Sequence, residues 1–432
     1  MSNSSERAQR VSHASGAGHG APASERVGES EGRSPSDRND SAGIGLLRRR
    51  AVMVGVAGVV AGGIGVALQP DQFMPSWLVG FLFCTGLSLG CLALLMLQHM
   101  TGGQWGLVSR RIFEAGSRLL WFGAVLFVPI VAFLPKLYPW AHADVVAADE
   151  ILKLKAPYLN FNFFILRAFV YFVVWMFCAN VLNKWSAAQD RGEVAVTEAD
   201  TRRFRVVSAP GLIAYVILMS LGAVDWIMSL EPHWYSTIYG FIVVVGQSLG
   251  ALSFTVAVLT ILAPREPMSS VLRAMHFHDL GKLMLALVML WAYFSFSQFL
   301  IIWAGNLPEE IPYYLTRLAG GWKYLSLALV FGHFVLPFCL LLSADLKKRP
   351  RLLARVAWFI VAMRLYDTIW LVGPVFHQAG AFPISLANVG IPLALAGAWV
   401  YLFTWQLQKR SLLPVNDPYF QQMMAQPHHG GH

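Results

Sequence analysis

The feature that most constrains this chain is a series of long apolar runs. Each run covers about 18–25 residues, the length a helix needs to cross roughly 30 Å of hydrocarbon. An isolated strand would leave backbone groups unpaired in lipid, so the runs predict helices. We expect ten membrane spans, near residues 51–68, 77–97, 119–135, 161–183, 211–230, 238–263, 283–305, 322–344, 352–373 and 384–406.

The composition agrees with this all-α, polytopic fold. Of 432 residues, 56% are hydrophobic and only 13% are charged, whereas an average soluble domain carries about 25% charged residues. This excludes an ordinary soluble enzyme and a disordered protein. The net charge of +9 could suggest nucleic-acid binding, but the basic residues gather in loops on one side. We therefore expect no nucleic-acid partner.

The basic loops set the expected orientation. Lys and Arg accumulate in cytoplasmic loops, and here they alternate with loops that carry mainly acids. Clusters occur at Arg48–Arg50, Arg110–Arg111, Arg202–Arg205 and Lys347–Arg351, and the last pair is Lys409–Arg410. Both termini are therefore expected in the cytoplasm, with the chain crossing a bacterial inner membrane many times.

Three regions follow from this pattern. Residues 1–45 are rich in Ser, Gly and Ala, and such a segment buries too little apolar surface to order itself. We expect it to be a disordered cytoplasmic tail. Residues 46–410 form the transmembrane helical domain, and residues 411–432 form a cytoplasmic C-terminal tail.

No motif indicates a bound redox centre or a hydrolytic site. The four cysteines form no CxxC pair and no CxxCH haem-attachment motif. The phosphate-binding, zinc-protease and serine-hydrolase motifs are also missing. Two axial histidines at one depth would be needed for a haem b, and the sequence offers only a weak outer pair, His233 and His377. We expect no directly bound cofactor.

Charged residues inside the spans are the candidates for chemistry, because each costs about 2.5–3.5 kcal/mol to insert. Arg364 and Asp367 lie three residues apart, on one helix face. Asp225 has no local cation, so it either pairs with a cation of another span, for which Arg167 is the candidate, or is kept protonated by burial. Each pair is either a neutralised packing element or part of a proton path.

Three histidine positions extend this set. His333 lies near the middle of its span, where a hydrogen-bonded core histidine is the simpler interpretation. His278 and Asp279 open another span and either collect protons or form a polar helix start. His233 lies in an outer cluster of acids and aromatic residues, which is first of all a membrane belt and alternatively a proton exit.

Two spans that begin on the same side share a weak motif. Each carries an Asp, then a Trp, and then a Pro at the outer edge; the two aspartates are Asp225 and Asp367, four spans apart. Such an echo is consistent with two parallel four-helix units.

Three strings resemble a known family. DWIMSLEPHWYSTIYG, FHDLGKLMLALVMLWAYFSFSQFLIIWAGNLPEE and HFVLPFCLLLS are similar to the F-type membrane subunit of bacterial alternative complex III, a quinol:cytochrome c or cupredoxin oxidoreductase. The resemblance covers about residues 50–410. It implies relationship to the polysulfide-reductase-type membrane anchors, with two four-helix bundles plus two extra helices.

The resemblance also implies partners and a role. The expected partners are a paralogous C-type membrane subunit, subunits that carry haem c and iron–sulfur clusters, and, as a further candidate, a terminal oxidase. Menaquinone or ubiquinone is the candidate lipid ligand. The F-type subunit itself is a non-redox part of the enzyme, with a role in quinone binding, proton translocation or assembly. The matching proton-path candidates are Asp225, His233, His278, Asp279, His333, Arg364 and Asp367, with Arg167 as a partner.

Two other classes of function remain open from the sequence. A stand-alone secondary transporter would also use buried charges and parallel repeats, although no pair of matching Gly/Pro-broken helices is visible. A purely structural membrane anchor for extramembrane subunits is the other alternative.

Overall fold

The computed structural model describes residues 35–192, 198–376 and 384–425, and the described ranges contain helices and no strand. Among them ten helical stretches are long and apolar enough to cross a membrane, which confirms the all-α prediction with ten spans. These stretches are formed by α1 (Pro35–Leu68), α2 (Phe73–Thr101), α3 (Gln104–Ser117) with α4 (Leu120–Ala132), α7 (Phe161–Asp190), α8 (Glu198–Trp226), α9 (Tyr239–Leu262), α11 (Ala274–Gly305), α13 (Trp322–Leu329) with η5 (Val330–Val335) and α14 (Leu336–Leu342), α16 (Pro350–Val372), and α17 (Leu386–Leu407).

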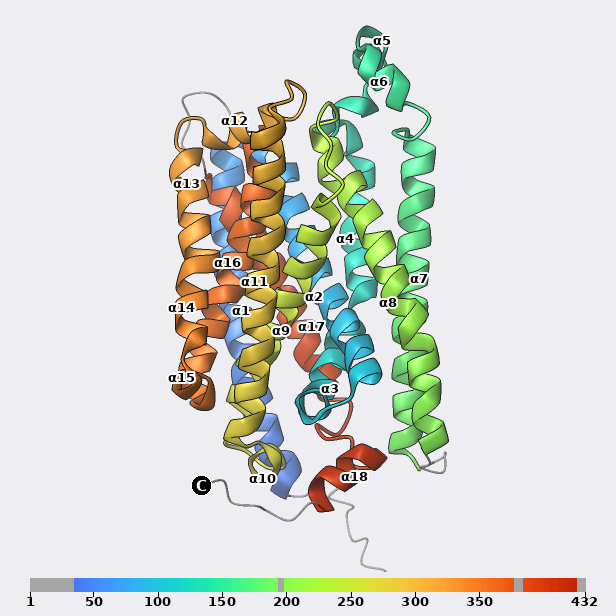
Figure 1. Ribbon diagram of the computed structural model, residues 1–432, viewed down its shortest axis with the longest axis vertical. Helices are drawn as coiled ribbons and strands as arrows, with labels where there is room; N and C mark the ends of the chain where they lie inside the picture. The colour runs from blue at the N-terminus through green and yellow to red at the C-terminus, as the bar shows by residue number, and fades with distance from the viewer. Residues whose placement is uncertain (1–34, 193–197, 377–383, 426–432) are drawn as a thin grey trace, which may run out of the picture.

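The helices form two groups of four and one pair. The first group contains α2, α3–α4, α7 and α8, and the second contains α9, α11, α13–α14 and α16 (Figure 1). Helices α2 and α9 are the most buried and contact each other, so the seam between the groups runs along them. Asp225 lies in the last helix of the first group and Asp367 in the last helix of the second.

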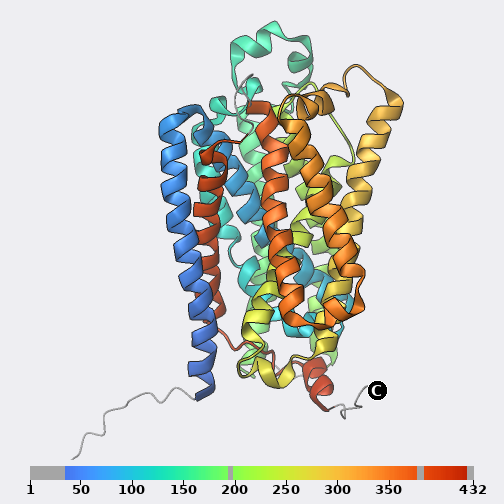
Figure 2. The ribbon, with the colours of Figure 1, turned by 90° about the vertical axis from the view of Figure 1, so that its left-hand side faces the viewer.

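Helices α1 and α17 lie side by side along most of their length (Figure 2). Glycines line the contact: Gly58 and Gly65 of α1 face the backbone of α17 at Ala394 and Ala387. A side chain at these positions would overlap that backbone, so only glycine permits this approach. The opposite face of α1 carries exposed apolar residues such as Val56 and Val59, as expected for a helix in contact with lipid.

Short elements lie at the two ends of the bundle (Figure 1). The basic end, where α1 begins, carries α10 (Met268–Val271), α15 (Ala344–Lys348) and α18 (Pro418–Ala425), and the opposite end carries α5 (Ala143–Ala148), α6 (Glu150–Lys155) and α12 (Pro312–Leu318). The remaining elements are short turns: η1 (Pro70–Gln72), η2 (Leu134–Lys136), η3 (Pro139–Ala141), η4 (Met228–Leu230) and η6 (Gly373–Phe376). Both ends of the described chain lie at the basic end. The assignment of that end to the cytoplasm stays a prediction.

Two boundaries differ from the sequence analysis. Helix α1 begins at Pro35, inside the segment predicted to be disordered, and proline is well tolerated in a first helical turn. Residues 1–34 lie outside the described residues. The third span begins at Gln104, well before the predicted residue 119, because the charges of α3 are buried in ion pairs rather than solvated in a loop.

Candidate functional site

The first buried charge pair joins two helices of the first group. Arg167 of α7 binds Asp225 of α8 through two hydrogen bonds, from Nε to Oδ2 at 2.9 Å and from Nη2 to Oδ1 at 2.8 Å. The Tyr171 hydroxyl donates a third, at 2.8 Å, and Asp225 is 0% exposed. The guanidinium also stacks over the ring of Tyr158, with 3.8 Å from Cζ to the centroid. This confirms the predicted cross-helix pair, and both carboxylate oxygens are engaged.

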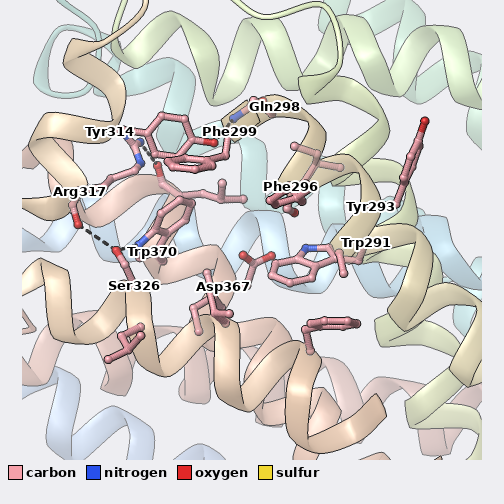
Figure 3. Close-up of a pocket in the computed structure, with 18 of the residues that line it drawn as sticks. Trp291, Tyr293, Phe296, Gln298, Phe299, Tyr314, Arg317, Ser326, Asp367 and Trp370 are labelled. Atoms are coloured by element: carbon pink, nitrogen blue, oxygen red, sulfur yellow. Dashed lines mark hydrogen bonds between the residues drawn. The ribbon is translucent and has the colours of Figure 1, made fainter. Parts of the chain in front are cut away.

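The second buried pair lies within α16. Arg364 donates from Nη1 to Asp367 Oδ2, as the spacing of three residues predicts. Its guanidinium lies against Gly246 of α9, where any side chain would collide with it. The Trp291 indole nitrogen of α11 points toward the Asp367 carboxylate (Figure 3). Unlike the first pair, this pair has both of its charged members on one helix. Neighbouring helices supply the residues that surround it, Gly246 and Trp291.

His333 belongs to this second cluster. It lies in η5, a π-helical turn between α13 and α14, and such turns often occur at functional positions. Its Nε2 is 3.5 Å from Arg364 Nη1, its ring lies 4.0 Å from that of Trp291, and its side chain is 0% exposed. Its other nitrogen, Nδ1, is buried without a protein hydrogen-bond partner. His333 is therefore a core histidine hydrogen-bonded to Arg364, as in the simpler interpretation of the sequence, and it belongs to the Arg364–Asp367 cluster.

A third ion pair was not anticipated from the sequence. Arg317 of α12 binds Glu231 at 2.9 Å and also donates to the carbonyl oxygens of Tyr313 and Leu371, both at 3.0 Å. Its guanidinium lies 3.5 Å from the centroid of the Tyr313 ring. The acids of the outer loops were visible in the sequence, but nothing there indicates that Glu231 meets a buried arginine almost ninety residues away.

The remaining candidates lie apart from these clusters. At the basic end, His278 Nδ1 is 3.9 Å from Asp279 Oδ1, and Lys282 bonds the same oxygen at 3.3 Å. At the opposite end, His233 Nε2 contacts Asp149 Oδ2 at 2.6 Å. His377 lies outside the described residues, so the weak outer haem pair has no described geometry.

A pocket of about 730 Å³ opens beside the second cluster. Residues of α11, α13–α14 and α16 line it (Figure 3), and α12 covers it at the end of the bundle opposite the basic end (Figure 1). Aromatic rings dominate its wall, among them Trp291, Phe296, Phe299 and Trp370. Asp367 is the single carboxylate among the lining residues, and it is 1% exposed.

The mouth of this pocket faces sideways. Tyr293 and Phe296 on α11 and Leu327 and Val330 on the other flank line the pocket and are at least half exposed. In a helix bundle within a bilayer, exposed apolar residues contact lipid. The pocket is therefore a lateral cleft, open on the apolar side of the bundle.

A second set of polar groups lines the covered end of the cleft. Gln298 donates to the Tyr314 hydroxyl at 3.3 Å, and Trp370 donates to Ser326 at 2.7 Å. Burial raises the pKa of Tyr314 to about 12, so this hydroxyl keeps its proton at neutral pH. The cleft combines an apolar aromatic wall with a few fixed polar atoms, the usual character of a small-molecule site.

The candidate residues predicted from the sequence therefore lie in several separate clusters. It brings Arg364, Asp367 and His333 together, and it pairs Arg167 with Asp225 in the other group. Nothing in the sequence indicates the lateral cleft or the role of Gly246. Periodicity could have found the aromatic residues of α11, but the cleft depends on how α11 and α13 splay apart.

The comparisons with known proteins do not identify the chain. Neither the protein-family models nor the curated proteins gave a match. Within the described residues, no group of three or more His, Cys, Asp or Glu side chains is placed to hold a metal ion.

Proposed function

We propose that this chain is an integral membrane subunit of a respiratory quinol:cytochrome c or cupredoxin oxidoreductase of the alternative complex III type. In this role it carries no redox metal of its own and supports proton movement, quinone binding or both. The three sequence strings that resemble the F-type subunit support the family. The multi-helix membrane fold is consistent with it.

One observation carries the proposed role: a buried carboxylate, Asp367, lines a cleft that opens to lipid. Arg364 binds this carboxylate, and His333 Nε2 lies 3.5 Å from the Arg364 guanidinium, so the titratable carboxylate of the cleft is close to a second titratable group, the imidazole. Groups of this kind inside a membrane usually mark ion or proton pathways. A purely structural anchor has no need for a carboxylate in such a cleft.

Co-purification tests the assignment to a complex. The tagged full-length chain, extracted in mild detergent, should elute with subunits that carry haem c and iron–sulfur clusters, identified by mass spectrometry and by a visible spectrum. A colourless, solitary protein would contradict the proposal and favour the transporter alternative, which flux assays would then test.

Charge-neutralising substitutions test the proton role. Asp225→Asn and Asp367→Asn each remove a titratable group but keep the side-chain shape. We expect both variants to assemble and to lower proton coupling or turnover of the complex, measured in proteoliposomes. Assembled variants that behave as wild type would leave only the role of an anchor.

A further inference from the structure

The surface that the lateral cleft offers to a ligand is almost entirely apolar. The polar residues at its covered end are themselves buried: Asp367, Arg317 and Tyr313 are each 1% exposed. The two charges are also balanced inside the protein, by Arg364 and Glu231. A ligand in this part of the cleft therefore meets aromatic and aliphatic side chains (Figure 3), and apolar contact rather than hydrogen bonding decides what binds there.

The cleft is long and follows the helices that line it. On α13–α14 its lining extends from Lys323 to Phe338, about 22 Å at 1.5 Å per residue. On α11 the lining extends from Met289 to Phe299, about 15 Å by the same measure. One leaflet contributes about half of a 30 Å hydrocarbon core, so the cleft is long enough for an extended acyl chain from one leaflet.

An unbalanced cation lies at one end of the cleft. Lys323 lines the cleft at the first turn of α13, where a membrane span begins at Trp322. It is exposed, its Nζ lies 4.9 Å from the centroid of the Tyr324 ring, and it forms no ion pair with any residue that the structure describes. The ends of membrane spans lie at the level of the lipid headgroups, where lysine extends its ammonium toward the interface. The cleft thus has a positive charge at its headgroup end.

We propose that the lateral cleft binds one anionic phospholipid, with an acyl chain between α11 and α13–α14 and the phosphate beside Lys323. A lysine ammonium binds phosphate as a point charge, and burial of the chain against the aromatic wall adds apolar contact. A zwitterionic lipid fits less well, because its own cation already balances its phosphate. The inference goes beyond the proposed function and does not depend on it, since the phospholipid takes no part in electron or proton transfer.

Photocrosslinking to the full-length chain tests this site. The chain is reconstituted in phosphatidylcholine nanodiscs that contain a small fraction of phosphatidylglycerol with a diazirine in its acyl chain, and the labelled residues are mapped by mass spectrometry. A photoreactive phosphatidylcholine with the same chains is the comparison probe. We expect phosphatidylglycerol to label Phe334 and Phe338, at the end of the cleft far from Lys323, about fivefold more than phosphatidylcholine does, the effect of one lysine near an anionic headgroup.

Three variants separate the headgroup contact from general contact with lipid. Lys323→Gln, at an exposed position, should reduce the labelling by phosphatidylglycerol to the level of phosphatidylcholine. Lys136→Gln is the matched control and should change nothing, because Lys136 is also an exposed lysine beside an aromatic ring but does not line the cleft. Leu327→Trp fills the mouth of the cleft from a position that is 55% exposed, so it should lower the labelling by both lipids.

Each of the opposite results would overturn the proposal. Equal labelling of Phe334 and Phe338 by the two lipids, or a preference that persists in Lys323→Gln, excludes the phosphate contact. Labelling by phosphatidylglycerol that is no stronger in the cleft than at Phe169 of α7, which is 65% exposed, excludes a specific site. Labelling that survives Leu327→Trp places the lipid outside the cleft.

Discussion

At the scale of single residues, the molecule shows two ways to bury an aspartate in a membrane. Asp225 is held by an arginine of the next helix and by a tyrosine, so its oxygens are occupied. Asp367 is held by an arginine of its own helix, and it lines the cleft. A buried ion pair contributes little net stability, but breaking it is costly. The two pairs therefore differ in the surroundings of the carboxylate: Asp225 is enclosed by protein side chains, whereas Asp367 borders a cavity.

The Arg364–Asp367 pair depends on a glycine of the neighbouring helix. A methyl group on Gly246 would overlap the Arg364 guanidinium, so Gly246→Ala should lower the free energy of unfolding by about 1–3 kcal/mol through overpacking. Thermal unfolding in detergent measures the effect. The matched control is Gly222→Ala in α8, whose nearest neighbour would lie at 3.5 Å, an ordinary contact. Equal melting temperatures for the two variants would contradict this role of Gly246.

At the scale of elements, the spans could be predicted from hydropathy because a helix in lipid must be apolar over its whole length. Hydropathy did not predict that α3 belongs to the third span. Arg110, Arg111 and Glu114 look like loop charges in sequence, yet they neutralise one another inside the protein. The spacing also predicted the Arg364–Asp367 pair, since both lie on one helix. The cleft and the Arg317–Glu231 pair could not be predicted, because they depend on how distant helices pack.

The contact between α1 and α17 should fail if one glycine gains a side chain. Gly58 faces the backbone nitrogen of Ala394 too closely for any substituent. We expect Gly58→Leu to separate the two helices and to increase hydrogen exchange along α1. Gly63→Leu is the control, because nothing lies within 4 Å of that position. Equal exchange in both variants would show that the pair does not depend on close approach.

Helix α6 should respond to acid through its N-cap. Asp149 accepts hydrogen bonds from the backbone N–H groups of Ile151 and Leu152, and the bond from Leu152 is the main cause that lowers the pKa of Asp149, with His233 also contributing. A lowered pKa in the folded state gives stability that is present above the unfolded value of about 4 and is lost as the pH falls through the folded value.

We therefore expect hydrogen-exchange protection of α6, corrected for intrinsic rates, to fall as the pH drops below about 4. Asp149→Asn should weaken this dependence. Asp144→Asn, at an exposed carboxylate of α5, should leave it unchanged. The same acid response in Asp149→Asn and in the wild type would rule out the N-cap as its source.

At the scale of the whole molecule, the chain after α17 returns across the basic end and binds the first helix group. Arg410 donates to Glu114 at 3.3 Å and to the carbonyl oxygen of Asn183 at 2.9 Å. Asp417 accepts from Arg110 at 2.6 Å. The segment predicted as a cytoplasmic tail, residues 411–432, thus includes a docked part, residues 411–425, which together with Arg410 ties α17 to α3 and α7.

This docked part should contribute to the stability of the first group. Asp417→Ala removes one acceptor of the buried Arg110, while Glu114 and Gln189 still bind the same guanidinium. We expect a loss of about 1–3 kcal/mol in the free energy of unfolding, the cost of a buried donor that loses its partner. Denaturant unfolding in detergent measures it, with Asp345→Ala as the control because that carboxylate is exposed in α15. Equal free energies of unfolding for Asp417→Ala and Asp345→Ala would contradict this role of the docked part.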